Sequence, residues 1–373
     1  MFTCSLRILL LLVPLLYNSL APAQQANPQT QPDQGTIYLD VVVTSKSGSP
    51  VTDLSKQDFT LLDNKVPQSI SSFKAVSSQQ APVEVILLVD AVNVGPETVA
   101  YERTQIEKFL TAKSGRLDHP TTFAVFTEID TQIHPDFTTD GKALAAALND
   151  ATIRLRTLSQ GHVRSDCTEG SACPDAGFEV ATERLHLSLK ALQTVAMHEA
   201  ARPGRKLVLW ISPGWPLLST TGELWQFTSP QLQEMFRRMV SLSTQLRQAR
   251  ITLYSIDPLG LRDVGIRTSD YAAYLKGVSN PKDVEPGNLG LQVFAVHSGG
   301  LVLNSGNDLA AFLQQCFADT QAYYEISFDP PAASRRDEFH HLELRIAKPG
   351  LHVRTLQSYY AQLSPASNTA SLP

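Results

Sequence analysis

From residue 82 onward, apolar strand-like runs alternate with long amphipathic helical patterns, and this alternation limits the fold more than any other feature. Such alternation is typical of a parallel sheet that helices cover on both faces. We therefore expect an α/β fold with a doubly wound, mostly parallel sheet. Its strands are predicted at Val83–Val89, Thr122–Phe126, Lys206–Ile211, Ile251–Ile256, Gly300–Leu303 and Ala322–Phe328.

Helical patterns fill the intervals between these strands. Pro96 can open the first helix because the first helical turn does not need its N–H. A hairpin after Glu128 predicts an antiparallel edge strand over Thr131–Phe137. The helices are predicted at Pro96–Ala112, Gly141–Arg156, Glu179–Ala200, Pro230–Gln248, Asn288–His297 and Asn307–Ala318.

Both ends of the chain show β patterns. Strands are predicted at Ile37–Thr44, Phe59–Leu62, Gln68–Phe73, Phe339–Ala347 and Leu351–Tyr360, separated by turns. The economical arrangement is an α/β domain inserted into a small sandwich-like β domain that both ends complete, and the alternative is two separate β caps. The chain is predicted to divide into a signal peptide at 1–23, a disordered lead-in at 24–35 and an N-terminal β segment at 36–80. The α/β domain follows at 81–331, then a C-terminal β segment at 332–363 and a disordered tail at 364–373.

The first 23 residues have the pattern of a secretory signal peptide. Arg7 is their only charged residue, Ile8–Leu16 is apolar, and Ala21–Ala23 is a small-residue cleavage site. The apolar core is too short to span about 30 Å of hydrocarbon, and no later segment has about 20 apolar residues. We expect a chain secreted or retained in the periplasm or cell envelope, with disordered segments at 24–35 and 364–373.

The charge excludes one class of partner. Removal of the leader takes the formal charge from −5 to −6, and no dense basic run remains to follow phosphates. Nucleic acid is therefore not an expected partner.

Three cysteines follow the leader. Cys167 and Cys173 lie in a polar, Gly-rich stretch, and an exported chain meets an oxidising compartment, so we expect a disulfide between them. A metal site is the weaker alternative, because His162 has no second ligand pair nearby. Cys316 falls within a helical pattern and is expected to be a buried thiol.

A lone acid, Asp90, ends the first α/β strand. Ligands of open α/β domains bind at the carboxyl ends of such strands. Alternatively, the Asp90 carboxylate accepts N–H groups of the loop that follows, and Asn93 caps the next turn or helix.

The chain resembles the von Willebrand factor A-related proteins abundant in acidobacteria, from about Ile37 to Ala361. The shared motifs are Tyr-Leu-Asp-Val-Val-Val at 38–43, Asp-Leu at 53–54, Asp-Phe at 58–59, Leu-Val-Asp at 88–90, Leu-Trp-Ile-Ser-Pro-Gly at 209–214, Ser-Gly-Gly at 298–300, Tyr-Tyr-Glu-Ile-Ser-Phe at 323–328 and Tyr-Tyr-Ala at 359–361. The resemblance implies a Rossmann-type sheet with a metal-ion-dependent adhesion site.

That adhesion site is degenerate in this sequence. The resemblance implies an Asp-x-Ser-x-Ser loop, and only its aspartate carries over, as Asp90, because Val92 and Val94 replace the serines. Ser212 stands where the fourth-strand aspartate belongs, and Thr182 is the candidate for the threonine. Hard cations need several oxygen ligands, so we expect no functional Mg²⁺ site and no other cofactor.

No catalytic set is evident. Ser212 follows a strand but lacks a Gly-x-Ser-x-Gly elbow, and Pro213 has no N–H to offer an oxyanion. A hydrolase that uses Ser212 near Asp90 and Asp257 is therefore a less favoured hypothesis for the function. A second alternative to a binding function is a structural component of the cell envelope.

We therefore expect a non-catalytic, adhesion-like module that binds an unknown protein partner through loops at the carboxyl ends of the strands. Aromatic residues often anchor interfaces, although in long loops they can equally pack onto the body of the domain. The candidate contact residues are Asp90, Asn93, Ser212, Trp215, Trp225, Asp257, Tyr271 and Tyr274.

Overall fold

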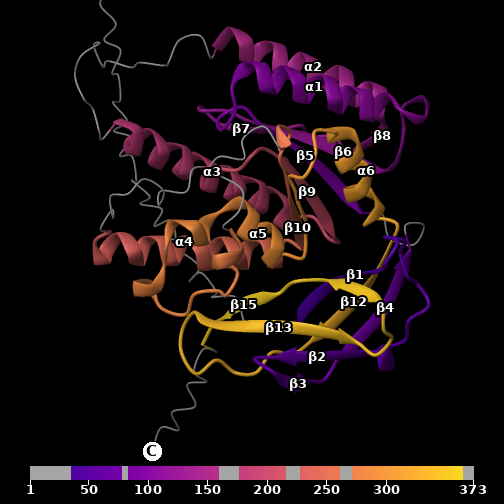
Figure 1. The fold of residues 1–373 in the computed structure, drawn as a ribbon, viewed down its shortest axis with the longest axis vertical. Coiled ribbons are helices and arrows are strands. Elements are labelled where there is room, and N and C mark those ends of the chain that lie inside the picture. Colours follow the sequence, from indigo (N-terminus) through magenta and orange to yellow (C-terminus); the bar gives the residue numbers. More distant parts are fainter. Residues whose placement is uncertain (1–34, 78–82, 159–175, 216–226, 261–270, 364–373) are drawn as a thin grey trace, which may run out of the picture.

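The computed structural model describes residues 35–77, 83–158, 176–215, 227–260 and 271–363. It contains a helix-covered sheet and, below it in Figure 1, a smaller β domain. The predicted leader, the predicted Cys167–Cys173 disulfide and the predicted disordered ends lie outside the described residues. Cys316 is buried and free, as predicted.

The central sheet has the order β11-β10-β9-β5-β6-β7, and β8 also pairs with β6. Its parallel strands are β5 (Glu84–Asp90), β6 (Arg116–Phe126), β9 (Lys206–Ile211), β10 (Ile251–Ile256) and β11 (Val302–Leu303). The antiparallel strands β7 (Thr131–Ile133) and β8 (Thr138–Asp140) lie against β6. This mostly parallel, helix-covered sheet confirms the predicted fold class.

Helices cover both faces of the sheet (Figure 1). One face packs against α1 (Pro96–Thr111), α2 (Gly141–Leu158) and α6 (Leu309–Ala318). The other packs against α3 (Ala176–Ala200), α4 (Ser229–Gln248) and α5 (Leu291–His297). Strands buried on both faces need apolar residues at successive positions, which explains the continuous apolar run of β5.

Short 3₁₀ turns lie between the larger elements: Lys56–Asp58, Lys113–Gly115, Tyr271–Tyr274, Pro281–Asp283 and Pro286–Leu289. The last of these replaces the first turn of the helix predicted from Asn288. Among the described residues, no helix combines the length and the apolar character needed to cross a membrane.

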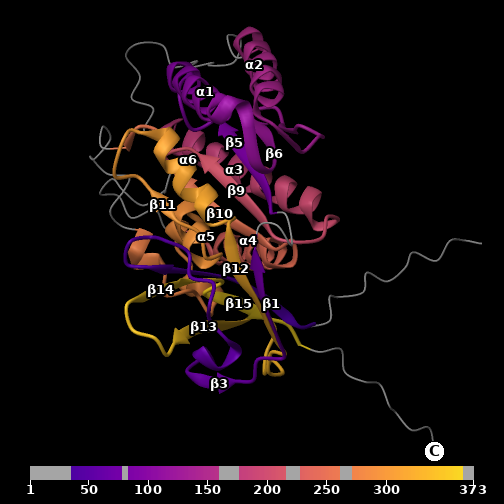
Figure 2. The ribbon, with the colours of Figure 1, turned by 90° about the vertical axis from the view of Figure 1, so that its right-hand side faces the viewer.

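The β domain consists of two four-stranded antiparallel sheets, with the orders β14-β1-β12-β4 and β15-β13-β2-β3. Each sheet contains strands from both ends of the described chain, and apolar side chains of the two sheets share one core. In Figure 2 this domain lies below the helix-covered sheet. The strands are β1 (Ile37–Ser45), β2 (Phe59–Asp63), β3 (Val66–Gln68), β4 (Ser72–Ser77), β12 (Ala322–Phe328), β13 (Glu338–Ile346), β14 (Leu351–Arg354) and β15 (Ser358–Ala361).

Three strand predictions were wrong. The strand predicted over Gln68–Phe73 is divided between β3 and β4, which belong to different sheets. Ala322–Phe328, which we assigned to the parallel sheet, pairs antiparallel with β1 and β4 instead. An apolar run shows only that a strand is buried, so its pairing partner cannot be obtained from periodicity. The strand predicted over Leu351–Tyr360 is divided into β14 and β15, which pair with β1 and β13 in different sheets.

An ion-pair cluster joins the two domains. Arg250, between α4 and β10, contacts Asp40 of β1 and Glu325 of β12, which face each other across the β1–β12 pair. The Arg250–Glu325 hydrogen bond from Nη2 to Oε2 measures 2.6 Å. The two carboxylates raise the pKa of the Arg250 guanidinium even though burial opposes that shift. The cluster therefore holds the sandwich against the α/β domain.

We expect Arg250→Met to lower the free energy of unfolding by about 3 kcal/mol, because it leaves two partly buried carboxylates without their cation. Urea unfolding measures the change. The matched control is Arg237→Met on α4, where the arginine is 62% exposed and the change should stay within about 0.5 kcal/mol. Equal losses in the two variants would contradict a role for the cluster in joining the domains.

Candidate functional site

The candidate site lies where the strand order of the central sheet reverses. Successive strands run from β5 to β6 in one direction and from β9 to β10 and β11 in the other. Crevices at such switch points, outside the carboxyl ends of the strands, hold the ligands of open α/β sheets. The last residue of β5 is Asp90, and Ser212 and Asp257 follow β9 and β10 directly. The fold therefore brings these three predicted residues to one edge of the sheet.

The Asp90 side chain is completely buried and accepts four hydrogen bonds from the protein itself. Its Oδ1 accepts the backbone N–H groups of Val92 at 3.0 Å and Asn93 at 2.9 Å. Its Oδ2 accepts Nδ2 of Asn93 at 2.8 Å and Nε1 of Trp210 at 3.0 Å. This confirms the interpretation of Asp90 as an acceptor for the loop that follows it.

Trp210 of β9 connects this carboxylate to the aromatic core. Its ring meets Phe126 and Trp215 edge to face, with centroids 5.9 Å and 5.3 Å away. Trp215 is buried too, and its Nε1 donates to the carbonyl of Leu289 at 2.7 Å. Trp215 therefore packs the loop after β9 onto the body of the domain and presents no surface to a partner.

Asn93 extends the network to α3. Its Nδ2 donates to Oγ of Ser188 at 2.9 Å, in addition to its bond with Asp90. Ser188 in turn donates to the carbonyl of Arg184, one turn earlier on α3. The predicted capping role was wrong, because Gly95 is the N-cap of α1 and no side chain caps that helix.

The other two polar residues at this edge are also used internally. Ser212 is fully buried, and its Oγ accepts the backbone N–H of Gly214 at 3.1 Å. Asp257 is 4% exposed, and its Oδ1 accepts the N–H groups of Leu259 at 2.9 Å and Gly260 at 3.3 Å. Each side chain orders the loop that follows its own strand.

A hard cation does not fit these donors. Mg²⁺ needs near-octahedral oxygen, and both Asp90 oxygens already accept N–H groups, while the side chains of Val92 and Val94 offer no oxygen. The described residues contain no group of three His, Cys, Asp or Glu side chains able to hold a metal ion. Among the described residues, the side chains of Asp90, Ser212 and Asp257 thus serve to order the loops that follow their strands.

The aromatic contact candidates differ in position. Tyr271 and Tyr274 lie in a half-buried 3₁₀ turn, and the Tyr274 ring covers Gly287, where an added Cβ would lie 2.3 Å from a ring carbon. Trp225 lies outside the described residues. Tyr271 is thus the described aromatic candidate that neither fills the core nor covers a glycine.

Glu102 of α1 is a residue of this site that the sequence analysis did not identify. It is 0% exposed, and neither carboxylate oxygen has a hydrogen-bond partner among the described residues. Burial first, and then the charges of Asp90 and Asp257, raise the pKa of the Glu102 carboxyl well above its usual range. A signal was present, because Glu102 shares the buried side of α1 with Ile106 and Leu110.

Comparisons with known proteins found remote structural similarity. No protein-family model matches the chain, and no curated protein matches it significantly. The structure of manganese-loaded TRAP protein from Plasmodium vivax is 11% identical, with 77% of this chain and 96% of that chain covered and a TM-score of 0.32. Human COPII-coat protein Sec24c is 8% identical, with 76% and 44% covered and a TM-score of 0.32. The TFIIH p34 N-terminal domain is 13% identical, with 48% and 82% covered and a TM-score of 0.26.

These similarities are too weak to support a function. The assignment to the α/β class depends on the sheet order and the helix layers of this chain.

The raised pKa of Glu102 predicts a pH-dependent stability. Below pH about 4.5 the carboxyl is neutral in both folded and unfolded chains, so its contribution to stability is fully present. Above that pH only the unfolded chain ionises, and the contribution is lost as the pH rises towards the folded pKa. Replacement by methionine should therefore stabilise the protein increasingly as the pH rises above about 5, by up to about 1.4 kcal/mol per pH unit until the pH reaches the folded pKa of Glu102.

Urea unfolding of the wild type and Glu102→Met across this range measures the difference. Glu97→Met, which changes an exposed glutamate of the same helix, is the control and should show little pH dependence. Parallel stability profiles for wild type and Glu102→Met would show that Glu102 ionises freely in the folded chain.

Proposed function

We propose that this chain is an exported, non-catalytic protein-interaction module of the adhesion-like von Willebrand A type. The observation that carries the proposal is the Asp90 carboxylate, whose two oxygens accept four N–H groups of the protein. The side chain best placed to begin a metal or catalytic site is thus used to order the loop. Recognition then depends on the surface of the loops above the sheet.

The geometry of Ser212 gives no support to a hydrolase. Its hydroxyl is buried, and among the described residues it has no hydrogen bond to a histidine or a carboxylate. A serine nucleophile needs a base within hydrogen-bond reach and an accessible position. We therefore assign the loops of this edge to binding.

Binding through this edge requires no cation in our proposal. Calorimetric titration of the mature chain with Mg²⁺, Mn²⁺ and Ca²⁺ should give no saturable binding in the micromolar range, because the N–H donors would have to be displaced from Asp90 first. Micromolar binding that disappears in Asp90→Asn would overturn this part of the proposal. The Asn side chain keeps the volume of Asp, so a loss of binding would not result from a cavity.

The partner surface is proposed to include the 3₁₀ turn Tyr271–Tyr274. Ala272 and Ala273 are exposed there between the two half-buried tyrosines. This turn packs against Pro286–Leu289, whose Leu289 carbonyl binds Trp215. The exposed turn is therefore connected to the ordered edge of the sheet, and Trp225 remains a further candidate.

A photo-crosslinking amino acid at Ala273 should capture a discrete protein from the native cell envelope, because that side chain projects from the proposed contact surface. The control places the same group at Val66 of β3, which is 58% exposed on the β sandwich. Mass spectrometry of the adducts identifies the captured protein. Tyr271→Ala should reduce the Ala273 adduct several-fold, as removal of an aromatic anchor does at interfaces.

Adducts from Val66 but not from Ala273 would favour a structural cell-envelope component that acts through its β domain. The same probe at the two positions thus separates the two hypotheses within one folded protein.

Export is proposed from the pattern of the first 23 residues. Intact-mass spectrometry of the chain recovered from its native host should show a mature protein that begins near Gln24. Recovery of the full-length chain would contradict cleavage.

A further inference from the structure

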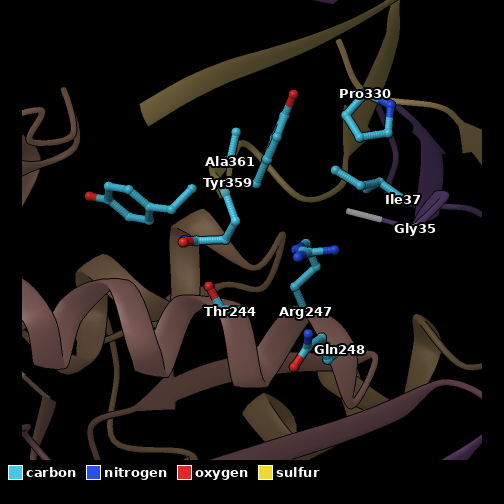
Figure 3. A pocket seen from close by; sticks show the side chains of 10 residues that line it. Gly35, Ile37, Thr244, Arg247, Gln248, Pro330, Tyr359 and Ala361 are labelled. Atoms are coloured by element: carbon cyan, nitrogen blue, oxygen red, sulfur yellow. The ribbon is translucent and has the colours of Figure 1, made fainter. Parts of the chain in front are cut away.

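A small cavity lies at the seam between the α/β domain and the β sandwich. Its volume is about 20 Å³, and it is lined by Thr244 and Arg247 of α4, Ile37 of β1 and Tyr359 of β15, among others. Figure 3 shows the Arg247 side chain extending from α4 into the space between Ile37 and Tyr359. Thr244, three residues earlier, lies on the same side of the helix.

Of the three polar residues of α4 that line this cavity, Thr244, Arg247 and Gln248, the first two have side chains without a polar partner among the described residues. The Arg247 guanidinium forms no ion pair or hydrogen bond with any residue that the structure describes, and its electrostatic neighbour is the Tyr359 phenol. The hydroxyl of Thr244 is buried and also lacks a hydrogen-bond partner within the described ranges. The phenol of Tyr359 donates to Asp63 at 2.6 Å, so its proton is already used.

Two nearby arginines that are also partly buried have carboxylate partners, whereas the buried Arg205 donates to the backbone carbonyl of Asp319. Arg250 contacts Asp40 and Glu325, and Arg354 donates to both oxygens of Asp319 at 2.6 Å and 2.7 Å. The carboxylates raise the pKa of Arg250, and Tyr254 together with Asp319 raises that of Arg354, whereas burial lowers the pKa of Arg247. A partly buried charge without a counterion is costly.

We propose that the seam cavity binds a small monovalent anion, the size of a chloride ion or of a carboxylate head group, with Arg247 and Thr244 as its donors. A guanidinium supplies several N–H groups in one plane, and a hydroxyl adds one more. A cavity of about 20 Å³ exceeds the roughly 10–15 Å³ that one water-sized group needs, so it has room for one small anion or head group.

Because the cavity lies between the two domains, a bound anion affects how firmly they dock. Its lining comes from α4 on one side and from β1 and β15 on the other. An anion bound to Arg247 therefore supplies the charge that the sandwich lacks at this point of the seam. Binding stabilises the docking of the two domains, and it is independent of the proposed partner surface at Tyr271.

Thermal unfolding of the mature chain in sodium acetate or sodium chloride, at ionic strength held constant with a large anion, tests the proposal. Each small anion that binds should raise the melting temperature in a saturable manner, by about 2 °C or more at saturation. Arg247→Met should abolish this shift while keeping the apolar stem of the side chain. Thr244→Val, which leaves the charge in place, should weaken the apparent affinity several-fold.

The comparison between salts identifies the anion. A shift with acetate alone assigns the cavity to carboxylates, and a shift with chloride at lower concentration assigns it to halides. Arg237→Met, on the exposed side of the same helix, should keep the wild-type response and controls for general salt effects. The proposal is overturned if neither salt gives a saturable shift, or if Arg247→Met responds as the wild type does.

Discussion

The hydrogen bonds to Asp90 are the constraint on which the upper edge of the sheet depends. A carboxylate at the end of a strand buried on both faces is stable only when donors surround it, and β9 provides one through Trp210 while the following loop provides three. The loop conformation, the aromatic cluster and the link from Asn93 to α3 all follow from this arrangement. The same bonds occupy the oxygens that a cation would need, so one interaction decides both the local structure and the kind of site that it can form.

The seam between the two domains depends on arginines in contrasting environments. Arg250 closes a cluster with carboxylates from two sandwich strands, whereas Arg247, only three residues earlier, faces a cavity without a carboxylate. Because each sheet of the sandwich contains strands from both ends of the chain, groups at this seam affect the closure of the whole β domain. An anion at Arg247 and the ions around Arg250 therefore act on the same equilibrium, which is the docking of the sandwich onto the α/β domain.

Much of the fold could be predicted from the spacing of apolar residues, which recurs every two residues in strands and every 3.6 residues in helices. The strands Lys206–Ile211 and Ile251–Ile256 have their predicted bounds, and the helices differ by a few residues at their ends. The failures concern pairing: Ala322–Phe328 is a strand as predicted but belongs to the sandwich, because an apolar run does not specify its neighbours. At the site, Asp90 was recognised as an acceptor for its loop. The sequence did not decide whether Trp215 contacts a partner or packs in the core, since tryptophan does both in proteins.

The sequence by itself determined the α/β class, the positions of most elements and the lack of serine oxygens after Asp90, because these follow from local residue order. Only the tertiary structure decided which groups lie near one another: Trp210 donates to Asp90, the charges of Asp90 and Asp257 act on Glu102, and Arg247 lines the cavity between the two domains. The physical reason is that burial and hydrogen bonding are properties of the assembled chain. A glutamate or an arginine on an amphipathic helix has the same local pattern whether its charge is solvated, paired or left alone in the interior.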